Sequence, residues 1–277
     1  MALCDFINNT SCSYAVAHPV VTDITIGPPS CSLDPRVWHP VRKDLYLYTS
    51  QKTVWLYVAL AEEGKLAAGD LVVTDIKVGE PPSKSSPDQL WTSRPGGIWV
   101  MRAAFSGNIV EAITEVDVLF GVDAVEPRPQ WTLMPSPLRL DAQPEVPDAR
   151  LSALRGRAKL PVPAALRINE DGKFRIVQIS DTHMVTGVGV CNDAIDAHGN
   201  YLPESEADPL TVNFIRSILD GERPDLVVLT GDQLHHDLPD SQSALFKVVA
   251  PIIKRSIPFA AVFGNHDSEG THALSRE

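Results

Sequence analysis

Short β-rich runs, separated by Pro and Gly clusters, fill most of the first half of the chain. In order along residues 20–122 they are VVTDITI, DLYLYT, TVWLYVAL, DLVVTDIKV, GGIWVMRAAF and EVDVLFGV. Short strands at regular spacing are typical of an antiparallel β-sandwich. We therefore expect a β-rich, sandwich-like N-terminal domain over residues 1–125.

Two of these runs resemble each other. VTDITIGPPS begins at Val21, and VTDIKVGEPPS begins at Val73. The likeness indicates either an internal duplication or two strands that end in similar turns. The second interpretation is favoured, because the sequence around the two runs does not repeat.

Prolines are dense between residues 126 and 165, in EPRPQW, MPSPLRLDAQPEVPD and LPVP. Such stretches make poor helices and serve as semi-rigid connectors. We expect a Pro-rich linker over residues 126–165 and a second domain over residues 166–277.

The second region begins with an apolar run at 174–180, which predicts a buried strand. Asp208 and Pro209 then suit the N-cap and first turn of a helix, and Gly221 suits its C-terminal end. The apolar face expected for this helix consists of Leu210, Phe214, Ile215 and Ile218.

Two more strands are predicted at 226–230 and 259–263, separated by an amphipathic segment over 244–255. Pro251 is expected to kink or split that segment. Strand, helix, strand, helix, strand in this order predicts a parallel sheet with helical crossovers. The fold class expected for the whole chain is therefore α+β, with β-rich and α/β parts.

Composition limits the classes of function. Hydrophobic residues make up 44% of the chain and charged residues 21%, as in ordinary globular proteins. The net charge of -11 disfavours sequence-independent nucleic-acid binding, which requires Lys and Arg. The four cysteines form no CxxC pair, and no run of about 20 apolar residues predicts a membrane span. With no signal-like N-terminal segment either, a cytoplasmic location is favoured.

Each of the three predicted strands in the second region ends in polar residues. Asp181 and His183 follow the first strand, Asp232 the second, and the run 264–267 (GNHD) the third. Any one of these groups alone is a common surface turn. Together, at the ligand-binding edge of a parallel sheet, their carboxylate and imidazole groups suit divalent metals such as Mn, Fe or Zn.

These motifs resemble those of the calcineurin-like metallophosphoesterase superfamily, which are D-x-H, G-D and G-N-H-D. QISDTHM, PDLVVLTGDQL, VFGNHDSEG and HALSRE, with RPGGIWV and DVLFGVDAVEPRPQW upstream, are similar to one branch of it. That branch is related to plant purple-acid-phosphatase-like proteins and to a fungal cell-cycle-regulating phosphatase. The resemblance implies that residues 166–277 are the first half of an α/β phosphoesterase domain of the four-layer βαβ type.

The resemblance also implies two metal ions and a role for each site residue. Asp181 and His183 bind the first ion, Asp232 bridges both, and Asn265 binds the second. His266 lies over the substrate phosphate, where it stabilises charge or protonates the leaving oxygen. A pair of ions about 3.5–4 Å apart polarises a phosphate and activates water. Asp267, next in the motif, has the position of a residue that orients His266 or a ligand, and it is equally consistent with a turn.

Two features depart from the family pattern. Purple acid phosphatases carry a tyrosine three residues after the bridging aspartate, where this chain has His235. His235 and His236 are candidates to touch substrate or metal, but the favoured interpretation is that they are solvated loop residues. The later histidine ligand and the Gly-His-x-His motif of the family are not in the sequence, which ends at Glu277. We therefore expect either a fragment of a longer gene product or a truncated form that cannot complete its site, with weak or no activity of the chain as given.

The leading hypothesis is a metal-dependent phosphomonoesterase that acts on a phosphoprotein or a small phosphate ester. A nucleotide phosphodiesterase uses the same ligands and is the alternative within chemistry. A non-catalytic interaction module with an incomplete metal site is the alternative from another class.

Overall fold

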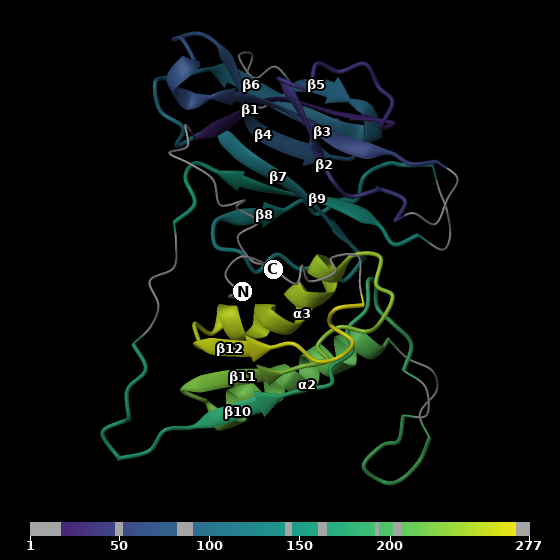
Figure 1. The fold of residues 1–277 in the computed structure, drawn as a ribbon, viewed down its shortest axis with the longest axis vertical. Coiled ribbons are helices and arrows are strands. Elements are labelled where there is room, and N and C mark those ends of the chain that lie inside the picture. Colours follow the sequence, from purple (N-terminus) through teal and green to yellow (C-terminus); the bar gives the residue numbers. More distant parts are fainter. Residues whose placement is uncertain are drawn as a thin grey trace. The chain divides into compact units, whose positions relative to one another are not determined.

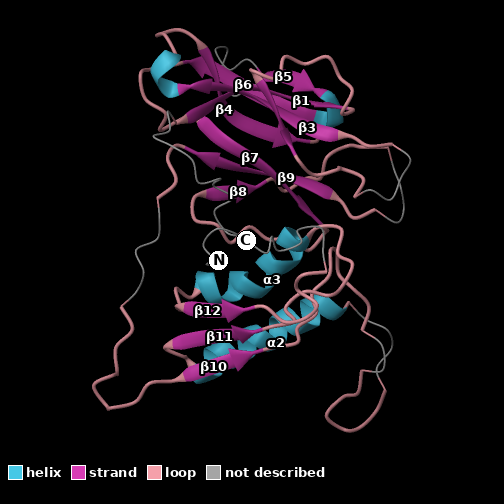
Figure 2. Ribbon diagram, in the orientation of Figure 1, coloured by secondary structure: helices cyan, strands magenta, loops and turns pink. Residues whose placement is uncertain are grey.

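The computed structural model describes residues 18–47, 52–81, 91–141, 146–159, 165–191, 194–201 and 206–269. The chain divides into two compact units, which we describe separately. The β-rich unit consists of Thr10–Leu119 and Arg128–Leu160. The βαβ unit consists of Met1–Asn9, Phe120–Pro127 and Pro161–Glu277. Figure 1 labels the elements, and Figure 2 shows that strands dominate one unit while both labelled helices lie in the other.

The described strands of the β-rich unit form three small sheets, each with three strands. Each sheet places its third strand along the chain in the middle, in the orders β1-β3-β2, β4-β6-β5 and β7-β9-β8. The strands are β1 (Pro19–Gly27), β2 (Trp38–Val41), β3 (Trp55–Glu62), β4 (Leu71–Val78), β5 (Trp91–Arg94), β6 (Ile98–Ala104), β7 (Ile113–Phe120), β8 (Trp131–Leu133) and β9 (Ala149–Arg155), with short 3-10 turns at Glu63–Lys65 and Pro95–Gly97.

The similar runs at Val21 and Val73 occupy equivalent places in two of these sheets. Each lies in the first strand of its sheet, and each shifts register against the middle strand just before an aspartate, Asp23 or Asp75. In both, the aspartate carboxylate accepts a hydrogen bond from the next backbone N–H. Asp117 in β7 does the same. The structural surroundings of the two runs therefore repeat, although the sequence around them does not, and this favours the internal duplication.

These three aspartates connect the sheets by ion pairs. Asp23 of the first sheet pairs with Arg94 of the second at 2.7 Å, and Asp75 of the second pairs with Arg155 of the third at 3.6 Å. Asp117 of the third sheet lies 3.5 Å from Lys43, which follows the edge strand of the first. The pairs therefore run from sheet to sheet around the whole unit. A small apolar core also joins strands of different sheets, with Val20, Val72, Phe105, Ile109 and Ala112 packed together.

Some sequence predictions for this unit are wrong. The run DLYLYT was expected to be a strand, but residues 45–47 form a turn, and residues 48–51 lie outside the described part. The buried Asp44 carboxylate accepts backbone N–H groups of Tyr46 and Val54, which fixes the turn. The Pro-rich linker contains β8 and β9, because Leu151 and Leu154 of β9 are buried. Strand β2 was not predicted because it contains Pro40. It is an edge strand, and edge strands tolerate proline.

The βαβ unit has a parallel sheet of three strands, as predicted. Its elements are β10 (Ile176–Ile179), α2 (Ala207–Glu222), β11 (Leu226–Thr230), α3 (Ser241–Lys254) and β12 (Phe259–Val262). Both strand pairs are parallel, with β11 in the middle. The two helices pack against each other, so they share one face of the sheet. Val227 and Leu229 are fully buried on this face, whereas Ile176 and Val262 on the other face are more than half exposed.

Helix α2 differs from its prediction in both its ends and its buried face. Glu206, not Asp208, is the N-cap, and the helix ends at Arg223 in a left-handed conformation rather than at Gly221. Phe214 is 67% exposed, and the buried apolar residues are Val212, Ile215 and Leu219. The helix carries two adjacent apolar stripes. The stripe with Val212, Ile215 and Leu219 packs inward, and the stripe with Leu210 and Phe214 is exposed.

Asp208 does not cap the helix because other groups bind its carboxylate. It accepts a hydrogen bond from the backbone N–H of Val185 and an ion pair from Lys247 of α3. Lys247 is buried and also contacts Asp123 at 2.9 Å. Burial raises the pKa of Asp208, and the Lys247 ammonium offsets this only in part. The crossover segment before α2 is thereby attached to α3.

Helix α3 continues through Pro251, so the helix is not split there. Because Pro251 lies in the last turn, its missing N–H costs only a single hydrogen bond near the helix end. The Asp240 carboxylate accepts the Ser243 N–H at 2.9 Å and caps the N-terminus. Across the described residues, neither helix is both long enough and apolar enough to cross a membrane.

Candidate metal centre

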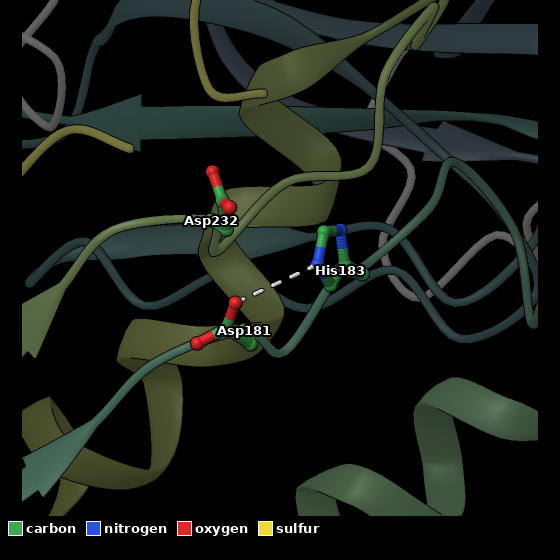
Figure 3. Close-up of side chains that lie close together, drawn as sticks. All are labelled: Asp181, His183 and Asp232. Atoms are coloured by element: carbon green, nitrogen blue, oxygen red, sulfur yellow. Dashed lines mark ion pairs between the residues drawn. The ribbon is translucent and has the colours of Figure 1, made fainter. Parts of the chain in front are cut away.

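The candidate site lies where the three parallel strands of the βαβ unit end. Asp181 follows β10, Asp232 follows β11, and Asn265 and His266 follow β12. Since parallel strands end at the same edge of a sheet, these loops meet there. Figure 3 shows the side chains of Asp181, His183 and Asp232 close together on two neighbouring loops, with a carboxylate oxygen of Asp181 facing the His183 ring.

One ligand atom from each of Asp181, His183 and Asp232 lies within 4.8 Å of the other two. The imidazole Nε2 of His183 is 4.0 Å from a carboxylate oxygen of Asp181 (Figure 3). Asp181 is exposed, and the other two are half-buried. Two carboxylates and an imidazole this close together form a donor set suited to a divalent metal ion.

Backbone hydrogen bonds hold the first two loops in register beyond the ends of their strands. The N–H of Asp181 donates to Gly231 O at 3.1 Å, and the N–H of His183 donates to Asp232 O at 3.1 Å. The ladder therefore continues from the parallel sheet into the site. It fixes the first two predicted ligands relative to the third.

All three of these residues have a left-handed backbone. The φ angles are 56° at Asp181, 44° at His183 and 50° at Asp232. Such conformations cost residues with a side chain about 1–3 kcal/mol each, and they concentrate at functional sites. The surrounding hydrogen bonds maintain a conformation that the chain would not adopt locally.

Two glycines allow the loops to approach closely. Gly231 has φ 100°, and a Cβ on it would lie 2.7 Å from Gly264 Cα. A Cβ on Gly264 would overlap the carboxylate of Asp232, with the Cγ atom only 2.7 Å away. Gly231 is required for both its left-handed φ and the close approach, whereas Gly264 is required for the close approach alone.

Asp267 is buried, and backbone groups occupy its carboxylate. One oxygen accepts the N–H of Asp232 at 2.9 Å and that of Gly264 at 2.7 Å, while the other accepts the N–H of Leu234 at 2.9 Å. Asp267 therefore ties the loop after β12 to the loop that carries Asp232. These contacts are with the backbone of both loops and not with the His266 ring, and the one to Gly264 is a turn contact.

Asn265 and His266 lie on the β12 side of the site. Asn265 is exposed and directly follows Gly264, whose backbone approaches Asp232. The backbone N–H of His266 donates to Asp232 Oδ1 at 2.9 Å, and its ring centroid is 5.4 Å from that of His183. The hydrogen bond to Glu269 raises the pKa of His266.

His235 and His236 also lie beside these residues, and His236 is exposed. The ring of His235 is 5.9 Å from that of His183, and the ring of His236 is 5.7 Å from that of His266. Burial lowers the pKa of His235 most, and the neighbouring histidines lower it further. The imidazoles of His235, His236 and His266 therefore border the donor set.

Two polar residues of the site were missed from the sequence. Gln233 is buried, and its amide donates to Gly231 O at 2.7 Å and to Ile179 O at 3.3 Å. Glu269 contacts His266. The one signal in the sequence was that Glu269 lies three residues after His266, a spacing at which turns bring side chains together.

Comparison with known proteins gives the family of this region. Residues 174–277 match the family model of calcineurin-like phosphoesterases. The chain is 38% identical to Phosphatase DCR2 of Saccharomyces cerevisiae over 162 residues, which are 57% of this chain and 27% of that protein.

Plant proteins match as well. The chain is 38% identical over 108 residues to Probable inactive purple acid phosphatase 28 of Arabidopsis thaliana, covering 38% of this chain and 26% of that protein. It is 35% identical over 121 residues to Probable inactive purple acid phosphatase 29 of the same plant, covering 40% and 29%. The chain thus spans less than a third of the length of each of these relatives. Residues 174–277 therefore resemble calcineurin-like phosphoesterases, and the chain is similar to the fungal and plant branch expected from its motifs.

Proposed function

We propose that this protein binds divalent metal ions at Asp181, His183 and Asp232 and hydrolyses phosphate monoesters with them. The observation that carries the proposal is the convergence of these three ligand atoms within 4.8 Å at the ends of parallel strands. The family match over residues 174–277 supports phosphate esters as the class of substrate. A phosphoprotein is one such substrate.

The donor set fits one ion directly, because two carboxylates and a neutral imidazole serve Mn, Fe or Zn. We propose a second ion on the other side of Asp232, with Asn265 as a further ligand. In support, the backbone beside Asn265 lies against Asp232, through Gly264. When bound, such ions supply Lewis-acid polarisation of the phosphate and activation of water.

The proposed role of His266 is to donate a proton to the oxygen that leaves when the P–O bond breaks. Its backbone contact with Asp232 supports a place for the ring next to the metal ligands. His235 and His236 border the same space and are available to contact the phosphate oxygens. Asp267 acts indirectly, because its carboxylate holds the backbone of Asp232.

A second candidate is a metal-binding module without catalysis. The plant relatives named above carry the word inactive in their names, and the donor set alone binds a metal without turning over a substrate. The nucleotide phosphodiesterase alternative uses the same ligands and differs in the substrate.

Metal titration and hydrolysis assays on the full chain separate these candidates. Calorimetric titration with Mn²⁺ or Zn²⁺ should show binding that Asp232→Asn removes. Weak Mn²⁺-dependent release of p-nitrophenol should come from the monoester p-nitrophenyl phosphate, in line with the weak activity expected from the sequence. Metal binding without turnover would favour the non-catalytic module. Faster hydrolysis of bis-p-nitrophenyl phosphate would favour the diesterase, and no metal binding would rule out the proposal.

The β-rich N-terminal domain over residues 1–125 and the linker over 126–165 stay predictions, as does the sandwich arrangement. The ion pairs around the three sheets support a unit that folds independently of the phosphoesterase segment. Limited proteolysis tests this division. Cleavage is expected between residues 126 and 165 but outside Trp131–Leu133 and Ala149–Arg155, which lie in a sheet.

A further inference from the structure

We propose that Glu269 is a positioning residue that holds the imidazole of His266 in the orientation and tautomer needed for proton transfer. The inference rests on the proposed function of His266 as a proton donor. Its basis is a contact of 2.8 Å between His266 Nδ1 and a carboxylate oxygen of Glu269.

A tight turn produces this contact. The backbone N–H of Glu269 donates to the carbonyl of His266 at 3.0 Å, so the chain turns back over residues 266–269. The backbone N–H of His266 in turn donates to Asp232 Oδ1 at 2.9 Å. His266 is therefore attached to the metal ligands through its backbone and to Glu269 through its ring.

The neighbouring carboxylate does not hold the ring of His266. Both oxygens of Asp267 accept backbone N–H groups, from Asp232, Gly264 and Leu234. Among the described residues that carry a carboxylate, Glu269 is the one in hydrogen-bond contact with an imidazole nitrogen of His266. The sequence motif alone would assign this task to Asp267, since it directly follows His266.

A carboxylate at Nδ1 decides which nitrogen faces the substrate. It accepts a hydrogen bond, so Nδ1 must carry the proton, and the tautomer is set by this partner. Nε2, on the opposite side of the ring, then gives its proton to the leaving oxygen as the P–O bond breaks. The Nδ1–H stays hydrogen-bonded to Glu269 throughout, so the ring becomes neutral without flipping its orientation.

The contact is partly exposed, with 35% of the His266 side chain and 48% of the Glu269 side chain accessible. Ion pairs this accessible contribute little to folding stability. Removing Glu269 should thus alter the ring without unfolding the loop, and the effect on chemistry can be measured separately.

The first test reads the tautomer directly and needs no turnover. Long-range ¹H–¹⁵N correlation spectra of the metal-free full chain, with His266 assigned through His266→Gln, should show the Nδ1–H form at alkaline pH. Glu269→Ala should shift the ring toward Nε2–H. Glu269→Gln keeps an acceptor oxygen and should retain Nδ1–H, and Glu170→Ala, an exposed glutamate of the same unit, is the matched control. An unchanged tautomer in Glu269→Ala would overturn the proposal.

The second test uses leaving groups of different basicity. Phenyl phosphate has a poor leaving group that needs the proton, whereas 2,4-dinitrophenyl phosphate does not. Glu269→Ala should lower kcat for phenyl phosphate by about 10- to 100-fold, the usual effect of losing a partner that orients a site residue, and leave KM unchanged. For 2,4-dinitrophenyl phosphate kcat should change less than about threefold.

Equal losses of kcat on both substrates would overturn the positioning role, because they would show that the change damages the site in general. No turnover by the unaltered protein would count against the proposed function alone. The spectra would still decide whether Glu269 holds His266.

Discussion

The carboxylate of Asp267 accepts the backbone N–H of Asp232 over 2.9 Å, so a buried residue of one loop fixes the backbone of the central metal ligand in another. This relationship separates two functions within one small region. Asp232 supplies a ligand, and Asp267 supplies the shape of the loop that presents it.

Asp267→Asn should therefore destabilise the protein more than Asp232→Asn does. An amide at position 267 replaces one acceptor oxygen by a donor that faces backbone N–H groups, at a cost of about 2–3 kcal/mol. Asp232→Asn keeps an oxygen for the His266 N–H and should change the stability of the metal-free protein by less than about 1 kcal/mol. Urea unfolding in EDTA measures both values.

Metal affinity should show the opposite order for the same two variants. Asp232→Asn should remove calorimetric Mn²⁺ binding, because the charged central ligand is lost, and Asp267→Asn should weaken it by about 10- to 100-fold. If both variants lost stability and affinity in equal measure, the division between ligand and support would be wrong.

Gly264→Ala should disrupt the metal site and leave the sheet intact. The new Cβ would overlap the carboxylate of Asp232 and force that ligand to move. We expect a loss of at least about tenfold in Mn²⁺ affinity, in line with changes to residues that support metal ligands. Gly221→Ala is the control. It meets open space near the end of helix α2 and should raise stability by up to about 1 kcal/mol with unchanged affinity.

Lys247→Met should strongly destabilise the βαβ unit. It leaves the buried Asp208 and its neighbour Asp123 without their cation, a change that costs about 3–5 kcal/mol. Lys254→Met removes an exposed lysine from the same helix and should be nearly neutral. Urea unfolding followed by far-UV circular dichroism compares the two. Similar midpoints for both variants would show that the buried ion pairs contribute nothing.

The β-rich unit should lose stability in acid, through Asp117. Burial raises the pKa of this carboxyl, but Lys43 and Arg128 outweigh burial and hold the pKa below its ordinary value of 3.8. The unfolded chain then binds the proton more tightly, so this contribution is complete above pH 3.8 and disappears as the pH falls through the lowered value.

Tryptophan fluorescence measures this, because all five tryptophans precede residue 132 and lie in the β-rich unit. Asp117→Asn should be less stable at neutral pH and should show a weaker dependence on pH below 4, near the usual aspartate range. A variant as acid-sensitive as the parent would assign the effect to other carboxylates.

The convergence of Asp181, His183 and Asp232 was predictable because its signals are local. Asp181 and Asp232 come just after strands rich in Val and Ile, and β11 begins and ends at the predicted residues. The inward face of α2 was not predictable in the same way, since Leu210 and Val212 belong to two apolar stripes of similar strength. Packing against α3 and the sheet decides between them.

Pairs between residues far apart in the sequence could not be predicted either, because they depend on how distant elements pack. Aspartate is a residue type favoured at helix N-caps. Only the contact of Asp208 with Lys247, 39 residues later, shows that its carboxylate forms a buried ion pair instead. Arg155 pairs with Asp75 across 80 residues, within a region that looked like a connector because of its prolines. No local pattern records such partners.

The left-handed backbone at Asp181, His183 and Asp232 has a consequence for mutational scans. Glycine adopts this conformation without the cost of about 1–3 kcal/mol that other residues incur, and this relief exceeds its own entropic penalty of about 0.5–1 kcal/mol. A scan scored by protein abundance should rank glycine as favourable at these three positions. A scan scored by metal binding should rank it among the worst, so the two screens would select opposite alleles at the same codons.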